Sequence, residues 1–326
     1  MATITSIGIG NMGAALASAL LKSPTPPNLT IWNRTADRPH VKALITEGAV
    51  FEPSLTSAIA RSNTILICLL DYPSITTALA PVLEETTTTT TTPHPLAGKT
   101  IINLTNGTPN QARAMEATLK RLGAAAYFDG GIMVTPQLVG TPASFVILSG
   151  ESQARFDSAD ENDNEGGGHV AALLKPVGAV QYVAADAGAA SLYDVAALTA
   201  MYGMFMGAFT GIALLRKQKR QEQVQGGVGE MVAAKPAVDS VMVPVLTALV
   251  PYVSLLADGV DKEDWMEDLG NPLAMQAAGM RNILQTCEEE GVDGTGMRFI
   301  SQLMDRAVEE GFGAGGVATI AKYLFK

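Results

Sequence analysis

The segment GIGNMG, residues 8–13, restricts the fold of this chain more than any other stretch. It follows a short apolar run, residues 4–8, and opens a stretch with helical spacing, residues 11–22. In a strand–turn–helix unit the first glycine permits a tight turn, the second lets the backbone approach a pyrophosphate, and the third allows close helix–strand packing. The helix N-terminus then presents free N–H groups to the anion. We therefore predict a dinucleotide site that includes Gly8, Gly10, Asn11, Met12 and Gly13.

The rest of the first half of the chain alternates between apolar runs and helical spacing. Further strands are expected at residues 29–32, 64–70, 100–104, 125–129 and 144–150, and helices at 36–47 and 109–122. This alternation is typical of βαβ units in a doubly wound, mostly parallel sheet. After about residue 185 the pattern changes to long helical stretches without convincing strands. We predict an α/β N-terminal Rossmann domain over residues 1–185 and an all-α C-terminal domain over residues 186–326, joined by a long interdomain helix at about 186–216.

Three polar segments interrupt these patterns. The threonine-rich stretch 84–95 and the acidic, glycine-rich stretch 160–168 predict surface loops. The polar, glycine-broken stretch 217–235 predicts a connection between two helices.

Composition excludes several classes of function. The 326 residues carry a formal net charge of −10, which argues against general binding to nucleic acid or to an anionic membrane. The two cysteines, Cys68 and Cys287, are far apart and form neither a metal motif nor a disulfide framework, so we expect a reducing, cytoplasmic compartment and no metal. The N-terminus lacks the pattern of a signal peptide. Residues 195–215 come closest to a membrane span, but glycine and polar residues interrupt them.

The end of the second strand indicates which dinucleotide is bound. A site for NAD usually has Asp or Glu there, which accepts hydrogen bonds from the ribose 2′-OH. This strand ends in Trp32-Asn33-Arg34-Thr35 and has no acid. A guanidinium pairs with a 2′-phosphate, and Asn33 and Thr35 add neutral donors. The alternative is a surface arginine in a loop. We predict NADPH as the cofactor.

Asp194 is an isolated acid within the long apolar stretch 189–209. A carboxylate in such surroundings costs free energy unless it is paired, exposed or used. In an apolar cleft it would stabilise a positively charged nitrogen, and it could also deliver a proton. Tyr202 follows on the same helix, about 80° away in azimuth and about 12 Å along the axis, so the two side chains could line one cleft without hydrogen bonding. The competing interpretation is a salt-bridged or exposed Asp194 with a core tyrosine.

Six stretches together resemble the β-hydroxyacid dehydrogenase and imine reductase superfamily, and within it the fungal NADPH-dependent imine reductases known as reductive aminases. They are WNRT (32–35), NLTNGTPNQAR (103–113), DGGIMVTPQLVGTPA (129–143), DAGAASLYDVAALTAMYG (186–203), LVPY (249–252) and NPLAMQAAG (271–279). The hydroxyacid dehydrogenases carry a lysine in the corresponding interdomain helix as the acid/base for an alcohol. This chain has no lysine between Gly188 and Leu215. The resemblance and the missing lysine both favour a C=N substrate.

The resemblance also implies roles for individual residues. Asp194, Tyr202 and Asn106 would be catalytic, and Asn106 would hydrogen-bond the amine or Asp194, although Asn106-Gly107 is also a common turn dipeptide. Tyr252, Met275 and Gln276 would line the substrate pocket, with a place in the helix core as the alternative for Met275. Leu69, Leu70 and Asn106 would contact the cofactor. The resembled enzymes are dimers that swap their helical domains, so each active site would use both chains.

Two other functions remain open at this point. One is a hydroxyacid-type dehydrogenase, which would oxidise 3-hydroxy acids with NADP⁺. The other is an NADPH-binding protein without catalysis. The leading prediction is an NADPH-dependent imine reductase that acts on an imine, or on a ketone and a small amine.

Overall fold

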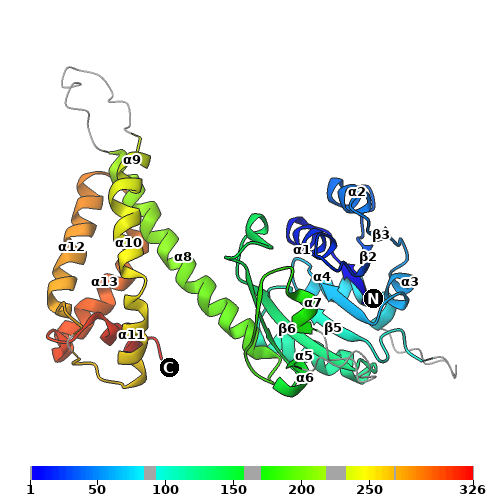
Figure 1. Ribbon diagram of the computed structural model, residues 1–326. Coiled ribbons are helices and arrows are strands. Elements are labelled where there is room, and N and C mark those ends of the chain that lie inside the picture. The colour runs from blue at the N-terminus through cyan, green and yellow to red at the C-terminus, as the bar shows by residue number, and fades with distance from the viewer. Residues whose placement is uncertain (1, 84–92, 158–169, 218–232, 268, 326) are drawn as a thin grey trace. The chain divides into compact units, whose positions relative to one another are not determined.

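In the computed structural model, residues 2–83, 93–157, 170–217, 233–267 and 269–325 are described (Figure 1). The chain divides into two compact units, Met1–Leu198 and Thr199–Lys326, and the division falls within helix α8 (Gly188–Arg216). The predicted loops 84–95 and 160–168 and the predicted connection 217–235 lie wholly or largely outside the described residues. The predicted domain boundary at residue 185 stays a prediction.

The first unit is built on one eight-stranded sheet with the order β3-β2-β1-β4-β5-β6-β7-β8. Its strands are β1 (Thr3–Ile7), β2 (Asn28–Trp32), β3 (Val50–Phe51), β4 (Thr64–Ile67), β5 (Thr100–Asn103), β6 (Ala126–Ile132), β7 (Phe145–Ser149) and β8 (Ala179–Tyr182). All neighbouring strands are parallel except β6 and β7. The strand order reverses between β1 and β4, the place where open α/β sheets bind ligands at their carboxyl edge. The predicted doubly wound, mostly parallel sheet is confirmed.

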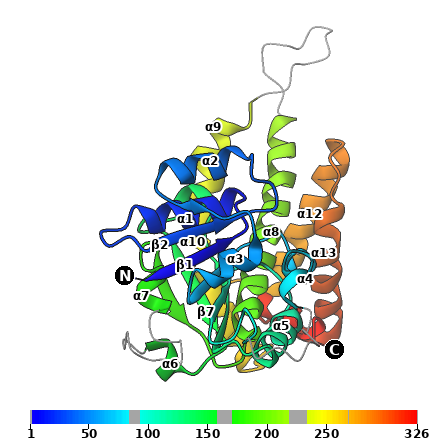
Figure 2. The ribbon, with the colours of Figure 1, turned by 90° about the vertical axis from the view of Figure 1, so that its right-hand side faces the viewer.

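Helices cover both faces of this sheet (Figure 2). One apolar cluster packs α1 (Asn11–Leu21), α2 (Pro39–Thr46), α6 (Gln153–Asp157) and α7 (Val170–Leu174) against the sheet. The other packs α3 (Leu55–Ala60), α4 (Tyr72–Leu83) and α5 (Pro109–Arg121). Side chains alternate between the faces, as a strand requires: Ile65 and Ile67 of β4 belong to the second cluster and Leu66 to the first. A short 3-10 helix, η1 (Pro136–Leu138), follows β6.

The boundaries of some strands differ from the sequence prediction, because the apolar run and the hydrogen-bonded strand do not cover the same residues. The apolar run 64–70 is longer than its strand, because β4 ends at Ile67 and Leu70 is 84% exposed. Strand β6 runs beyond the predicted residues 125–129 to Ile132, since Gly130, Gly131 and Ile132 pair with β7. The short strands β3 and β8 were not predicted, because neither is long enough or buried enough to produce a clear apolar pattern.

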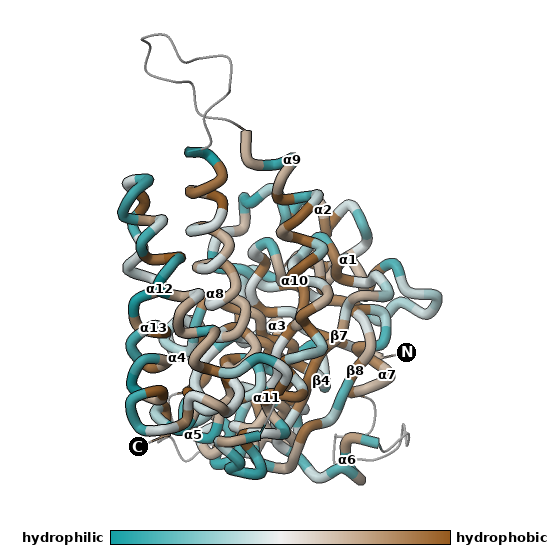
Figure 3. Tube along the Cα trace, turned by 90° about the vertical axis from the view of Figure 1, so that its left-hand side faces the viewer, coloured by the Kyte–Doolittle hydropathy of each residue, from teal (hydrophilic) through white to brown (hydrophobic). Residues whose placement is uncertain are grey.

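The second unit consists of helices. After the C-terminal part of α8 its described elements are α9 (Lys235–Ala237), the π-helix η2 (Val238–Met242), α10 (Val243–Leu249), α11 (Tyr252–Asp261), α12 (Leu273–Glu289), α13 (Thr295–Ala307), the π-helix η3 (Val308–Phe312) and the 3-10 helix η4 (Val317–Tyr323). Their fully buried apolar cluster is small and centres on Leu273, Ala277, Met304 and Ala307. Hydrophobic residues run along α10, whereas much of α12 is hydrophilic (Figure 3).

Two helical stretches are long and apolar enough to cross a membrane, Gly188–Arg216 and Lys235–Asp261. Within the chain they are hardly covered, since 6% and 0% of their most apolar windows are buried. Exposed large side chains include Phe209 on α8 and Val250 and Val253 near α11. Length and composition alone are weak evidence for a membrane span, and helices that pack against another protein chain have the same character.

Candidate active site

The glycine turn between β1 and α1 has the conformation that its sequence predicts. Gly8 has a φ of +97°, and a Cβ there would lie 2.3 Å from the Cys68 carbonyl oxygen. A Cβ on Gly13 would lie 1.9 Å from the Gly8 carbonyl oxygen, whereas one on Gly10 would meet nothing within 4 Å. Gly8 and Gly13 are therefore required by the tight turn, and the space beside Gly10 is open to a ligand.

The first turn of α1 adds donors to this open space. Gly10 is the N-cap, and the first turn contains no acidic residue that would compete for the N–H groups. Asn11 begins the helix, and its Oδ1 lies 3.0 Å from His40 Nε2 of α2. Met12 is half-buried and packs against the first apolar cluster. The backbone N–H groups of this turn suit a pyrophosphate.

The loop after β2 is tied to the glycine turn by Asn33. Its Oδ1 accepts a hydrogen bond from the Ile9 backbone N–H at 3.0 Å, and its Nδ2 donates to the Thr35 carbonyl at 2.8 Å. The side chain thus holds two loops together, a role that the sequence analysis did not include. Arg34 and Thr35 are exposed beside it. An exposed guanidinium without an acid at the end of β2 fits a cofactor that carries a 2′-phosphate.

The turns after β1, β4 and β5 lie on one edge of the sheet, because these strands are parallel neighbours. Leu69 joins the three turns: a Cβ on Gly8 would lie 2.7 Å from Leu69 Cδ2, and the Leu69 N–H donates to Thr105 Oγ1 at 3.0 Å. Burial raises the pKa of the nearby Cys68 thiol to about 12, so this thiol stays protonated at neutral pH. Leu70, the other expected cofactor contact of this turn, is exposed.

The isolated acid of the sequence lies on this same edge. Asp194 is 9% exposed, and its Oδ2 accepts a hydrogen bond of 2.7 Å from Asn106 Nδ2. A Cβ on Gly131 would lie 3.1 Å from Asp194 Cβ, so the glycine near the end of β6 lets the carboxyl group pack against the sheet. Among the residues that the structure describes, Asp194 forms no ion pair. The acid is therefore buried and hydrogen-bonded to an amide.

A buried polar cluster that contains none of the predicted site residues lies next to this pair. It consists of Tyr72, Asn103, Tyr127, Asp129 and Ser191. Asp129 is fully buried, and burial raises the pKa of its carboxyl group while the four surrounding donors lower it. Burial and the neighbouring Asp129 charge also raise the pKa values of Tyr72 and Tyr127. The available sequence signal was a polar residue in each of two otherwise largely apolar strands, Asn103 at the end of β5 and Asp129 in the middle of β6.

The remaining predicted residues belong to the helical unit. Tyr202 is 64% exposed and contacts Phe205 edge-to-face, with ring centroids 6.1 Å apart. Tyr252 begins α11, and its hydroxyl donates to the Leu269 carbonyl at 3.1 Å. Met275 on α12 is 54% exposed, so it does not belong to the core of its unit. Gln276 Nε2 donates to the Asn271 carbonyl at 2.8 Å.

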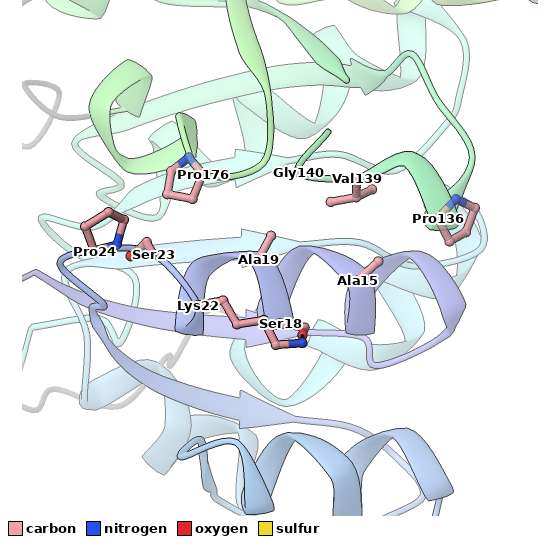
Figure 4. A pocket seen from close by; sticks show the side chains of 10 residues that line it. All are labelled: Ala15, Ser18, Ala19, Lys22, Ser23, Pro24, Pro136, Val139, Gly140 and Pro176. Atoms are coloured by element: carbon pink, nitrogen blue, oxygen red, sulfur yellow. Dashed lines mark hydrogen bonds between the residues drawn. The ribbon is translucent and has the colours of Figure 1, made fainter. Parts of the chain in front are cut away.

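A pocket of about 450 Å³ lies elsewhere, between the middle of α1 and the segments around η1 and Pro176 (Figure 4). Ser18, Lys22 and Gly140 are among its lining residues, and none of the predicted site residues is. Lys22 is already bound to Ser18 and Glu47.

In the described parts of the chain, no group of three or more His, Cys, Asp or Glu side chains could hold a metal ion.

The fold and the edge of its sheet define a class of protein: a dinucleotide-dependent oxidoreductase with a buried carboxyl group beside the cofactor site. Comparison with known proteins narrows this class. Residues 3–155 match the NAD binding domain of 6-phosphogluconate dehydrogenase, and residues 186–326 match the C-terminal domain of NADPH-dependent reductive aminase-like proteins. The chain belongs to the NADPH-dependent reductive aminase family, as its sequence predicted.

Individual relatives agree with this assignment over nearly the whole chain. An NADPH-dependent reductive aminase of Aspergillus oryzae is 32% identical over 97% of this chain and 95% of its own length. A reductive aminase of Aspergillus terreus, solved with NADPH4, cyclohexanone and allyl amine, is 32% identical with a TM-score of 0.81 and 99% coverage of both chains. An imine reductase of the same organism, solved with NADPH4 and dibenz[c,e]azepine, is 34% identical with a TM-score of 0.77 and 99% coverage of both chains.

Proposed function

We propose that this protein reduces imines to amines with NADPH and that Asp194, held by Asn106, is its central catalytic group. The observation that carries the proposal is the 2.7 Å hydrogen bond between these side chains on the sheet edge that also carries the glycine turn. A ketone and a small amine are proposed as the precursors of the imine, because a relative was solved with cyclohexanone and allyl amine.

The chemistry of this site follows from the negative charge of Asp194, whose side chain is almost inaccessible to solvent. NADPH, when bound, supplies the hydride that the imine carbon receives. A protonated C=N group is already a strong electrophile, so the protein needs to stabilise a positive nitrogen, exclude water and manage one proton. The Asp194 carboxylate attracts the positive nitrogen, and low solvent exposure strengthens that attraction. Asn106 Nδ2 donates a hydrogen bond to Asp194 Oδ2. We assign Asp194 Oδ1 to the substrate nitrogen.

The predicted cofactor is confirmed by the relatives, which are NADPH-dependent or were solved with NADPH. In this chain we assign the 2′-phosphate to Arg34, since its guanidinium is exposed beside the glycine turn. Arg34→Ala should raise the KM for NADPH much more than the KM for NADH, measured with the same imine. A similar increase for both cofactors would overturn the assignment. Arg61, whose guanidinium pairs with Glu52, offers a control, and Arg61→Ala should leave both KM values unchanged.

The absence of lysine from α8 separates this activity from alcohol oxidation. A hydroxyacid-type dehydrogenase needs an acid/base that can accept the alcohol proton, and the described residues of α8 provide Asp194 in that part of the helix but no lysine. Oxidation of a 3-hydroxy acid with NADP⁺ at a rate comparable to imine reduction would favour that alternative. Asp194→Ala with wild-type turnover would instead favour an NADPH-binding protein without catalysis.

We propose further that Tyr202, Tyr252, Met275 and Gln276 line the substrate pocket in a homodimer. Supporting observations are the apolar side chains exposed on α8 and on the stretch 235–261, and the small buried core of the helical unit. A second copy of the chain would cover these side chains. Light scattering should therefore give the mass of a dimer. A monomer would contradict the proposal.

We also propose a cytoplasmic location and neither membrane nor nucleic-acid partners. Flotation of the protein with neutral vesicles would show membrane binding and would contradict this proposal.

One measurement tests the proposed activity most directly. NADPH consumption is followed with a cyclic imine and, separately, with a ketone and a small amine at near-equal concentrations. Turnover of both substrates supports reductive amination, and turnover of the cyclic imine alone limits the activity to imine reduction. No turnover of either, with NADPH bound, would refute the proposal.

A further inference from the structure

Asp129 is a buried carboxyl group whose partners are all uncharged. Its Oδ1 accepts a hydrogen bond from Ser191 Oγ at 2.6 Å. Its Oδ2 accepts hydrogen bonds from Tyr127 Oη at 2.7 Å, from Asn103 Nδ2 at 3.0 Å and from Tyr72 Oη. Within the described residues no lysine, arginine or histidine forms an ion pair with it. Burying such a group without a cation is costly, so its donors must be held firmly in place.

One arm of this cluster leads to Asn106. Asn103 ends β5, and while its Nδ2 donates to Asp129, its Oδ1 accepts the Thr105 backbone N–H at 3.2 Å. Thr105 Oγ1 in turn accepts the Leu69 backbone N–H at 3.0 Å. The turn that carries Asn106 is therefore fixed from the buried side by Asn103 and from the turn after β4 by Leu69.

The other arm leads to Asp194. Ser191 donates to Asp129 Oδ1 and lies one turn before Asp194 on the same face of α8. The beginning of α8 is also attached to the sheet by Ser149, whose Oγ donates to the Ala187 carbonyl at 3.0 Å and accepts the Ala190 N–H at 2.9 Å. Ser191 lies three residues before Asp194, so its hydrogen bond to Asp129 holds the turn of α8 that carries Asp194.

We propose that Asp129 is a positioning residue that fixes both partners of the Asn106–Asp194 hydrogen bond. Its Oδ2 holds the Asn106 turn through Asn103, and its Oδ1 holds the Asp194 turn of α8 through Ser191. Asp129 is fully buried and acts only through these two sets of hydrogen bonds. The proposal rests on the proposed function, because it assumes that the Asn106–Asp194 pair carries the reaction.

The test removes the hydrogen bond between Ser191 and Asp129 without changing the charge of the protein. Ser191→Ala removes the hydroxyl that binds Asp129 and leaves Asp194 and Asn106 in place. We expect kcat for a cyclic imine to fall about tenfold, as misplacement of a catalytic group does, while the KM for NADPH stays within about twofold of the wild type. Ser191→Thr keeps the hydroxyl and should restore most of kcat. Asp129→Asn should lower kcat at least as much, and it is the secondary variant because it is more prone to misfolding.

Ser62→Ala is the matched control. Ser62 is as buried as Ser191, and its Oγ accepts a hydrogen bond of 2.9 Å from Thr5 in another part of the same unit. This variant should lose thermal stability comparably to Ser191→Ala and keep its kcat. Equal kcat values for the two variants would overturn the positioning role, because loss of a buried hydrogen bond would then explain everything.

A double-mutant comparison adds a second criterion. In an Asn106→Ala background the Asn106–Asp194 bond is already absent, so Ser191→Ala should reduce kcat by much less than tenfold. Fully multiplicative effects would overturn the proposal. A wild-type enzyme without imine turnover would refute the proposed function itself, an outcome that differs from wild-type turnover with an unaffected Ser191→Ala variant.

Discussion

Replacing Asp194 by asparagine removes one negative charge and little else. Asparagine has nearly the same size, so the contact with Gly131 and a hydrogen bond with Asn106 both remain available. At a separation of about 4 Å and an effective dielectric constant of about 20, a carboxylate stabilises a cation by about 4 kcal/mol. Since about 1.4 kcal/mol corresponds to a factor of ten in rate, Asp194→Asn should lower kcat/KM for a cyclic imine by roughly a thousandfold.

The assay measures NADPH consumption at saturating NADPH for the wild type and for Asp194→Asn. Affinity for NADPH should be nearly unchanged, because the glycine turn and Arg34 are untouched. Asp305→Asn is the control, since this exposed carboxylate pairs with Arg281 on the surface of the helical unit and should keep kcat/KM within about twofold. A loss of less than about fivefold in Asp194→Asn would refute the electrostatic reasoning.

The same variant distinguishes charge stabilisation from proton transfer. A permanently charged N-alkyl iminium substrate needs no proton, whereas a neutral imine does. If Asp194 only stabilises the cation, Asp194→Asn lowers the rates of both substrates equally. A larger loss with the neutral imine would show that Asp194 also delivers the proton.

Three further outcomes follow from the structure. Gly8→Ala should destabilise the protein by about 2 kcal/mol or more in urea unfolding, because φ is +97° and the new Cβ would lie 2.3 Å from the Cys68 carbonyl oxygen. Gly10→Ala meets open space, so it should leave the unfolding free energy nearly unchanged and weaken NADPH binding in a titration. The folded-state pKa of Asp129 is raised, so its contribution to stability is fully present below its unfolded pKa of about 4 and is lost as pH rises through the folded value. The free-energy difference between wild type and Asp129→Asn should therefore shift against the wild type as the pH rises above about 4. A difference that stays constant with pH would contradict the raised pKa.

Residue patterns that are local in the sequence were enough to predict much of the fold and the cofactor. The strand, the glycine turn and the helix of residues 3–21 are continuous in sequence, so the short-range requirements for a positive φ at Gly8 and for close packing at Gly13 were readable from residue types. The missing acid after β2 and the presence of Arg34 likewise lie within a few residues. Very short elements such as β3, which has two residues, contain no alternation of apolar and polar residues from which a strand could be predicted.

The sequence by itself determined the strand–turn–helix unit, the doubly wound sheet and the presence of an isolated acid on a long apolar helix. Only the tertiary structure decided what that acid contacts. Asn106 and Asp194 are 88 positions apart, and they meet because the parallel order of β4, β5 and β6 brings the ends of these strands to one edge, where α8 begins. The same order assembles Asp129 with donors from α4, β5, β6 and α8. No local pattern encodes such contacts, because the free energy that holds them comes from burial shared by segments distant along the chain.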